Sequence, residues 1–181
     1  MEIISTNIPD VLLIKPQVFG DERGFFMESF NSKRWLEATG LERTFVQDNH
    51  SRSAHGVVRG LHYQMPQPQG KLVRCLAGEI YDVAVDLRLG SPTFGTWVGA
   101  FLSAENHLQL WVPEGFAHGF AVISPSADVF YKTTAYYAPE YEKSLLWNDP
   151  ELNIKWPALD RPVLSVKDQN AATLKHAECY R

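Results

Sequence analysis

Short segments in which apolar and polar residues alternate run from Val11 to Tyr137 of this 181-residue chain, with turn-forming residues between them. These segments are rich in β-branched and aromatic side chains, which favour strands over helices. In residues 81–87, apolar residues alternate with small or acidic ones, and glycine, proline or serine marks the turns at 89–92 and 124–126. Further candidate strands cover residues 96–102, 108–112 and 128–137. The pattern predicts an all-β fold.

Two short helices are expected to interrupt the strands. Asn31 is a candidate N-cap for a helix over residues 32–39, which Gly40 would end. Asp168 is a candidate N-cap for a second helix over residues 169–177. Together with the strand pattern, this predicts a double-sheet barrel with short peripheral helices.

Composition limits the classes of protein that fit. No linker, repeat or low-complexity segment divides the chain, so we expect a single domain over residues 1–181. Two cysteines, Cys75 and Cys179, and no N-terminal export signal or long apolar stretch favour a cytoplasmic protein without a membrane partner. The net charge of -4 argues against a nucleic-acid partner, although local arginines could still bind a small anion.

Two short stretches resemble the signature motifs of the cupins, small antiparallel barrels whose ancestral site holds a divalent metal. One contains His62 and Gln64 with Lys71 after them, and the other is the stretch 113–118, which ends in His118. Gln64 stands where a second histidine would be, and Lys71 stands where a glutamate would be. A charged lysine cannot bind a metal, but it can stabilise negative charge on a substrate oxygen. We therefore expect neither a metal nor another cofactor.

Strand periodicity predicts a cluster of polar groups inside the barrel. Residues two apart in a strand share a face, so His62, Lys71, His118 and Tyr131 are all expected to point inward. Each such group costs free energy to desolvate, which favours a functional site. Taken singly, each also has a structural interpretation: a hydrogen-bonded core histidine, a surface lysine or a tyrosine lining the barrel.

Longer motifs resemble the dTDP-4-dehydrorhamnose 3,5-epimerase family over essentially the whole chain. The matching segments are collinear and cover residues 23–28, 47–51, 58–64, 69–74, 112–120, 131–132 and 165–168. The resemblance implies a cupin double-stranded β-helix, or jelly roll, and an epimerase. Its reaction inverts C3 and C5 of dTDP-4-dehydro-6-deoxy-D-glucose, on either side of the C4 ketone.

The resemblance also implies catalytic roles. His62 would be the general base, with Asp168 fixing its ring in the manner of a His–Asp dyad. The competing role of Asp168 is the helix cap described above. Lys71 would stabilise the enolate, Tyr131 would donate a proton on the opposite face, and His118 would hydrogen-bond a sugar hydroxyl or the keto oxygen.

Other residues are expected to bind the nucleotide diphosphate. Arg23 and Arg59 offer planar donors suited to phosphate, and Lys167 adds a third cation. By resemblance, the remaining nucleotide contacts come from Glu28, Gln47, Asn49, Tyr137 and Glu142.

Arg59 poses a geometric difficulty, because it lies three residues from His62 and so on the other face of a regular strand. A bulge at Gly60, or a site shared between subunits, would remove it. The family resemblance implies a homodimer in which an N-terminal segment joins the neighbouring sheet, so that Arg23 or Gln47 could come from the partner chain.

Three alternative functions fit the same residues. The first is an enzyme that inverts only C3 or only C5, since one inversion needs the same base and acid as two. The second is a metal-dependent cupin enzyme, and the third is a nucleotide-sugar binder without catalysis.

Overall fold

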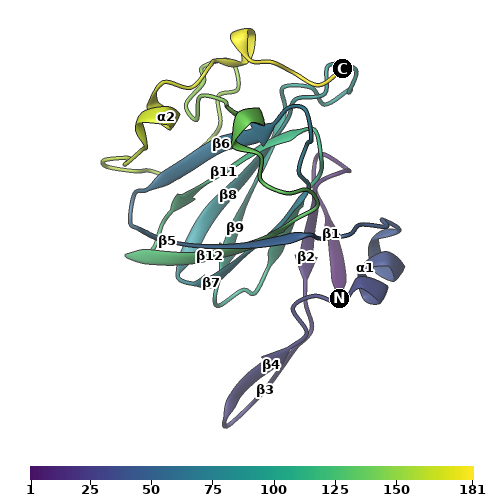
Figure 1. Cartoon of the computed structure of the whole chain (residues 1–181). Helices are drawn as coiled ribbons and strands as arrows, with labels where there is room; N and C mark the ends of the chain where they lie inside the picture. The colour runs from purple at the N-terminus through teal and green to yellow at the C-terminus, as the bar shows by residue number, and fades with distance from the viewer.

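Two antiparallel sheets face each other and enclose the core (Figure 1). The structure is a computed structural model that describes all residues from 1 to 181. The larger sheet has six strands in the order β1 (Glu2–Ser5), β2 (Leu12–Lys15), β10 (Gln109–Val112), β7 (Lys71–Ala77), β12 (Ser126–Thr133) and β5 (Gln47–Ala54). The smaller has five, in the order β13 (Glu142–Ser144), β6 (Val58–Gln64), β11 (Phe116–Val122), β8 (Glu79–Asp86) and β9 (Trp97–Ser103). The predicted all-β, double-sheet architecture is confirmed.

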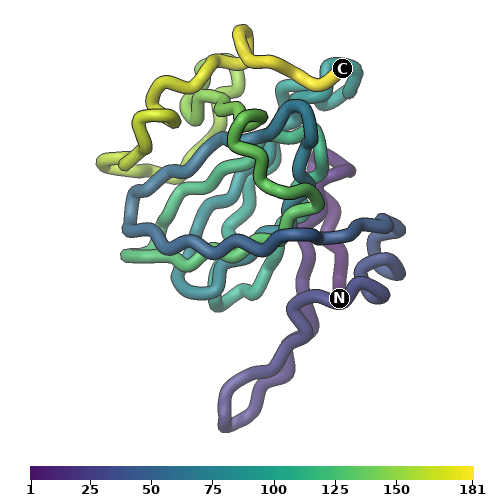
Figure 2. Tube along the Cα trace, viewed as in Figure 1, coloured from purple at the N-terminus to yellow at the C-terminus, as the bar shows by residue number.

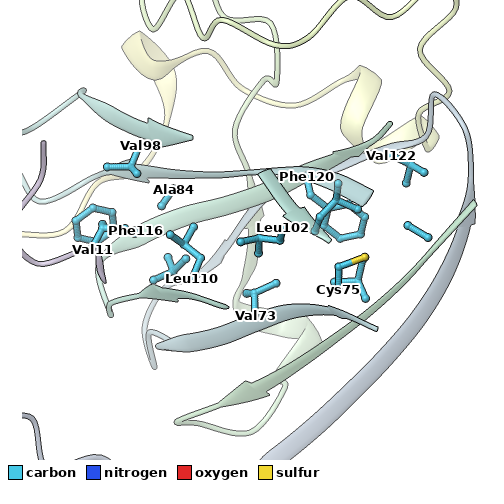
Figure 3. Packing of buried hydrophobic residues seen from close by; sticks show 14 of the residues in the cluster. Val11, Val73, Cys75, Ala84, Val98, Leu102, Leu110, Phe116, Phe120 and Val122 are labelled. Carbon is cyan, nitrogen blue, oxygen red and sulfur yellow. The ribbon is translucent and has the colours of Figure 1, made fainter. Parts of the chain in front are cut away.

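Inward-facing apolar side chains of both sheets form the main core (Figure 3). Val73 and Cys75 of β7 pack there against Ala84 of β8 and Phe120 and Val122 of β11. Burying an apolar side chain of this size stabilises the fold by about 1.5–3 kcal/mol. The inward-facing apolar residues of the alternating pattern are therefore the ones that pack the two sheets together.

The five-stranded sheet is also buried on its outer face. There Val83 and Val85 of β8 pack with Ala117 of β11 and with Leu145 and Leu152 of the C-terminal segment. In Figure 1 this segment lies across the sheet, and the C-terminus is marked at the upper right. Because both faces are covered, most of β8 is buried, and its acidic residues Asp82 and Asp86 are completely buried.

The first predicted helix is confirmed as α1 (Ser32–Thr39). Asn31 Oδ1 accepts a hydrogen bond from the Arg34 amide at 3.1 Å, and Gly40 ends the helix with φ of 70°. Trp35 is the buried residue of this helix and packs against Trp111 of β10. No helix in the chain is both long and apolar enough to cross a lipid bilayer.

The second predicted helix is wrong in extent and in its cap. Residues 169–177 do not form one helix; instead α2 (Val166–Gln169) is a single turn, and a 3₁₀ turn, η2 (Leu174–His176), follows. Ser165 Oγ caps α2 by accepting from the Asp168 amide at 3.1 Å. Asp168 therefore lies inside the turn, which leaves its carboxylate free to bind elsewhere.

The last predicted strand is too long, since β12 ends at Thr133 rather than Tyr137. Beyond it the chain crosses to the other sheet, where Gln64 Nε2 donates to the Tyr136 carbonyl and Gln64 Oε1 accepts from the Ala138 amide. A second 3₁₀ turn, η1 (Pro139–Tyr141), then leads into β13. These two hydrogen bonds of the Gln64 side chain hold residues 136–138 against β6.

A two-stranded hairpin, β3 (Val18–Asp21) and β4 (Gly24–Met27), projects away from the barrel (Figures 1 and 2). Phe19, Phe25 and Phe26 on this hairpin are 55%, 61% and 70% exposed. Such a row of exposed aromatic side chains is typical of a surface that another chain covers.

Candidate active site

His62 and Asp168 are in direct contact although they lie 106 residues apart in the chain. Nε2 of His62, on β6, is 2.6 Å from Oδ1 of Asp168, on α2. The Gly60 amide also donates to Asp168 Oδ2, at 3.4 Å. Burial acts to raise the pKa of Asp168, but hydrogen bonding and charge from His62, with Ser165 and Gly60, hold this pKa below its usual value. Asp168 is therefore a carboxylate that orients the imidazole.

Lys71 begins β7 and is only 8% exposed. Its Nζ lies 3.4 Å from the carbonyl oxygen of His62. Burial lowers the pKa of Lys71 to about 8, against the negative charges of Asp82 and Glu142, which raise it, while the positive charge of Lys167 lowers it. The ammonium of Lys71 is thus a weakly hydrated cation beside the backbone of His62.

Tyr131 is half-buried on β12, between Asn49 of β5 and Val73 of β7. Burial raises the pKa of its phenol; the charge of Arg59 opposes this shift, and Glu142 and Tyr137 add to it. The phenol therefore stays protonated at neutral pH and can donate a proton.

A bulge in β6 resolves the difficulty of Arg59. Opposite β11, the pairing shifts from His62 with His118 to Arg59 with Phe120, so β6 has one extra residue. Gly60 lies in the bulge with φ of 109°, which favours glycine. Arg59 Nε donates to Ser53 Oγ at 2.9 Å, and Arg59, His62, Lys167 and Asp168 line one hollow.

Five of the predicted nucleotide-binding residues form a connected polar chain. Gln47 Nε2 donates to Asn49 Oδ1 at 3.0 Å, and Gln47 Oε1 accepts from the Tyr137 amide at 2.9 Å. The Tyr137 hydroxyl donates to Glu142 at 3.2 Å, and Lys167 Nζ lies 2.8 Å from the same carboxylate. Glu142 lies on β13 opposite Gln64, next to His62, and the ring of Tyr137 is half-exposed.

His118, on β11, is buried and binds Asp82 of β8, with 2.8 Å between Nε2 and Oδ1. Sequence reasoning missed Asp82. The signal was present, because Asp82 alternates with the inward-facing Ile80 and Ala84, where a carboxylate is unexpected. Ser53, which positions Arg59, was also missed, and nothing in its sequence context distinguishes it from other strand serines.

Arg23 and Glu28 are not brought to this site within one chain. Arg23 is exposed near the tip of the β3–β4 hairpin and pairs with Asp21. Glu28 follows β4 and binds Asn31 and Arg34, at 3.0 and 3.3 Å. Figure 1 shows the hairpin pointing away from β6, β7 and α2.

The donor set in the barrel is not that of a metal centre. Gln64, at one ancestral ligand position, is engaged with backbone groups of Gln67, Tyr136 and Ala138. Lys71 at the other position presents a cation. No three histidine, cysteine, aspartate or glutamate side chains lie close enough together to hold a metal ion. The arrangement instead combines an imidazole, a phenol and a buried ammonium group.

Two facing antiparallel sheets with this polar interior define a cupin-type barrel, as predicted from the sequence. The sequence profile of the dTDP-4-dehydrorhamnose 3,5-epimerase family matches residues 5–176. The chain belongs to this family and is an isomerase.

Three relatives illustrate the match. The dTDP-4-dehydrorhamnose 3,5-epimerase of Pseudomonas aeruginosa is 61% identical over 180 residues, which cover 99% of each chain. A crystal structure of a Legionella pneumophila dTDP-6-deoxy-D-glucose-3,5-epimerase in complex with dTDP-4-keto-L-rhamnose has a TM-score of 0.97 and 55% identity, covering 99% of this chain and 97% of that one. A more distant relative, the dTDP-4-dehydrorhamnose 3-epimerase of Streptomyces niveus, is 39% identical over 98% of this chain and 86% of that one.

Proposed function

We propose that the chain inverts C3 and C5 of dTDP-4-dehydro-6-deoxy-D-glucose to give dTDP-4-dehydro-L-rhamnose. The observation that best supports this is the contact of His62 with Asp168 beside the buried ammonium of Lys71. A carbon next to a ketone loses its proton only if a base and a stabiliser of the enolate oxygen lie close together. This site offers both within one barrel end.

In the proposed mechanism, His62 removes the proton from C3 or C5, and Lys71 stabilises the negative charge that forms on the C4 oxygen. Asp168 holds the imidazole and stabilises the imidazolium. Tyr131 then donates a proton to the opposite face of the same carbon. The imidazolium and the phenolate that result must exchange protons with solvent before the second inversion, so solvent hydrogen enters each inverted carbon.

The nucleotide is proposed to bind along the polar chain beside this centre. Arg59 and Lys167 supply positive charge for the diphosphate next to His62. Asn49, Gln47 and Glu142 offer hydrogen bonds, and the half-exposed ring of Tyr137 is available to stack on thymine. His118 would bind the sugar.

We also propose a homodimer in which the β3–β4 hairpin of one chain completes the site of the other. The exposed aromatic residues of the hairpin support this, as does the position of Arg23 in the turn between β3 and β4 and of Glu28 directly after β4, since the hairpin projects away from the barrel. Each site would then combine the barrel of one protomer with the hairpin of its partner.

Proton NMR of the purified protein with its substrate in deuterated water tests the reaction. We expect deuterium at both C3 and C5 of the product. Tyr131→Phe should keep exchange by His62 but slow product formation by about 10²–10⁴-fold, since the general acid is lost. Tyr136→Phe, an exposed tyrosine nearby, is the matched control. Substrate that binds without any exchange would reject the proposal in favour of a noncatalytic binder.

A single inversion is the second candidate, because the Streptomyces niveus relative is a 3-epimerase. The same experiment separates the two reactions. Deuterium at one carbon only, with the other hydrogen retained, would assign the chain to that class.

A further inference from the structure

Asp82 is a carboxylate in the middle of the barrel that the proposed mechanism does not use. It is completely buried on β8, in a run where Val83, Ala84 and Val85 are also fully buried. Its Oδ1 contacts His118 Nε2 at 2.8 Å, but its Oδ2 is buried without any hydrogen-bond partner. An ionised group in such a place costs several kcal/mol unless other charges compensate. Packing alone does not explain it.

The contact with Asp82 determines what the His118 ring can do. Since an ionised carboxylate only accepts hydrogen bonds, Nε2 of His118 must carry the hydrogen. In the neutral ring, Nδ1 is then an acceptor. Nδ1 makes no hydrogen bond within the chain and is not sealed in the core. It can therefore accept a hydrogen bond from a sugar hydroxyl, whereas it has no hydrogen to offer a keto oxygen.

Asp82 also acts on Lys71. The charged groups around Lys71 come from three elements: Asp82 from β8, Glu142 from β13 and Lys167 from α2. Burial lowers the pKa of Lys71 to about 8, and the negative charge of Asp82 is the largest influence that opposes this, followed by Glu142. The uncharged neighbours of this region include the His62 carbonyl on β6 and the phenol of Tyr131 on β12. Burial raises the pKa of the Cys75 thiol on β7 to about 11, and the negative charge of Asp82 adds to this rise.

We propose that Asp82 is a positioning residue of this site, which fixes His118 through Nε2 and provides the negative charge opposite the Lys71 ammonium. In this role it directs Nδ1 of His118 to a hydroxyl of the sugar and keeps Lys71 positively charged for the enolate. The inference rests on the proposed function, because it assigns Asp82 to the same reaction. A purely structural Asp82 would only satisfy the buried histidine.

Nitrogen-15 NMR of the ligand-free protein tests the two contacts directly. We expect the wild-type His118 ring to carry its hydrogen on Nε2. In Asp82→Asn, whose amide oxygen can still accept from Nε2, the titration midpoint of Lys71 should move to lower pH by roughly one unit, because the negative charge that most opposes the effect of burial is lost. Asp149→Asn, which removes another buried carboxylate far from the barrel centre, is the matched control and should leave Lys71 unchanged.

Kinetics of the same variants provide the second readout. For Asp82→Asn we expect kcat to fall by about 10–100-fold, as for other residues that orient a functional histidine, and the alkaline limb of the pH profile to move to lower pH. The melting temperature should stay close to that of the wild type, because the asparagine keeps the hydrogen bond from Nε2 of His118.

The outcomes are distinguishable. A wild-type His118 ring with its hydrogen on Nδ1, or an unchanged Lys71 midpoint in Asp82→Asn, would overturn the assignment of Asp82 whatever the activity. If Asp82→Asn does not fold, the wild-type ring decides the contact with His118, and Asp82→Ser, whose hydroxyl oxygen can also accept from Nε2, repeats the titration of Lys71. If both NMR results are as expected but the wild type exchanges no substrate hydrogen, the coupling of Asp82 to His118 and Lys71 stands and the proposed function fails.

Discussion

Lys71 carries its ammonium group into a part of the barrel where water is almost excluded, and this has two opposite effects. The poor hydration of the cation opposes folding, since burial lowers the pKa of Lys71 to about 8. The same poor hydration strengthens its attraction to an anion that forms nearby. A residue that is costly to the fold is thus well suited to stabilise an enolate.

Replacing Lys71 by methionine separates these effects. Lys71→Met should lower kcat by about 10²–10³-fold, because the stabiliser of the oxyanion is lost. It should also raise the free energy of unfolding at pH 7 by about 1–3 kcal/mol, because a buried charge is removed. Steady-state kinetics and urea unfolding measure the two, with the exposed Lys15→Met as control. A loss of stability together with the loss of activity would show that Lys71 is structural.

The lowered pKa of Lys71 also predicts a pH dependence of the wild-type enzyme. The ammonium is present below the folded-state pKa of about 8 and is lost as the pH rises through that value. Activity should therefore fall on the alkaline side near pH 8. The limb should be absent from the residual activity of Lys71→Met, and a limb that persists there would belong to another group.

At the scale of elements, the site depends on an irregularity in β6. The bulge at Gly60 turns Arg59 and His62 toward the same hollow, which a regular strand would not do. A Cβ atom at Gly60 would lie 2.7 Å from the His118 carbonyl oxygen and 2.8 Å from the Gly119 Cα, on rigid backbone of β11. The close approach of β6 and β11 therefore requires glycine at this position.

Gly60→Ala should destabilise the fold by about 2–3 kcal/mol through the clash with β11 and the positive φ. It should also reduce activity in the fraction that remains folded, because Arg59 and His62 are displaced. Gly90→Ala is the matched control, since a Cβ there would meet no atom within 4 Å. Equilibrium urea unfolding and kcat/KM below the transition measure both effects. If Gly60→Ala had the stability and kcat/KM of the wild type, position 60 would not require glycine.

Local sequence signals predicted the elements that are stabilised locally. The helix α1 is fixed by Asn31 at its start and Gly40 at its end, and both were recognisable in the sequence. The helix expected after Asp168 is wrong because Ser165 caps the turn and the Asp168 carboxylate binds His62, 106 residues away, a pairing that only the family resemblance predicted. Asp82 was overlooked for a similar reason, since only the paired register of β8 and β11 reveals its neighbour His118. Pairings between distant strands are not encoded in any short motif.

At the scale of the whole molecule, the barrel and the hairpin contribute different parts of the proposed site. The barrel of one chain contains His62 and Lys71, while Arg23 lies on the projecting hairpin. The net charge of -4 means that an anionic substrate must be met by local cations, and one chain gathers only some of them at its centre. A second protomer would supply the rest.

Complementation between two inactive variants tests this division. If hairpins are exchanged, a heterodimer of Arg23→Ala and His62→Asn chains has one site with both defects and one with none. Random pairing then restores about a quarter of the wild-type sites, because half of the dimers are mixed and each has one intact site. Co-expression of the two chains with different tags, followed by kcat/KM measurement and light scattering for a mass of about twice 20.5 kDa, gives the readout.

The pair His62→Asn with Lys71→Met is the matched control, because both defects lie in the barrel. Every mixed dimer then has one defect in each site, and no activity should return. If activity returned in both pairs, the recovery would not come from the exchange of hairpins within a dimer. A mixed dimer of Arg23→Ala and His62→Asn that stays inactive, with its composition verified by mass spectrometry, would mean that each chain binds the diphosphate with its own hairpin, and the exchange would be wrong.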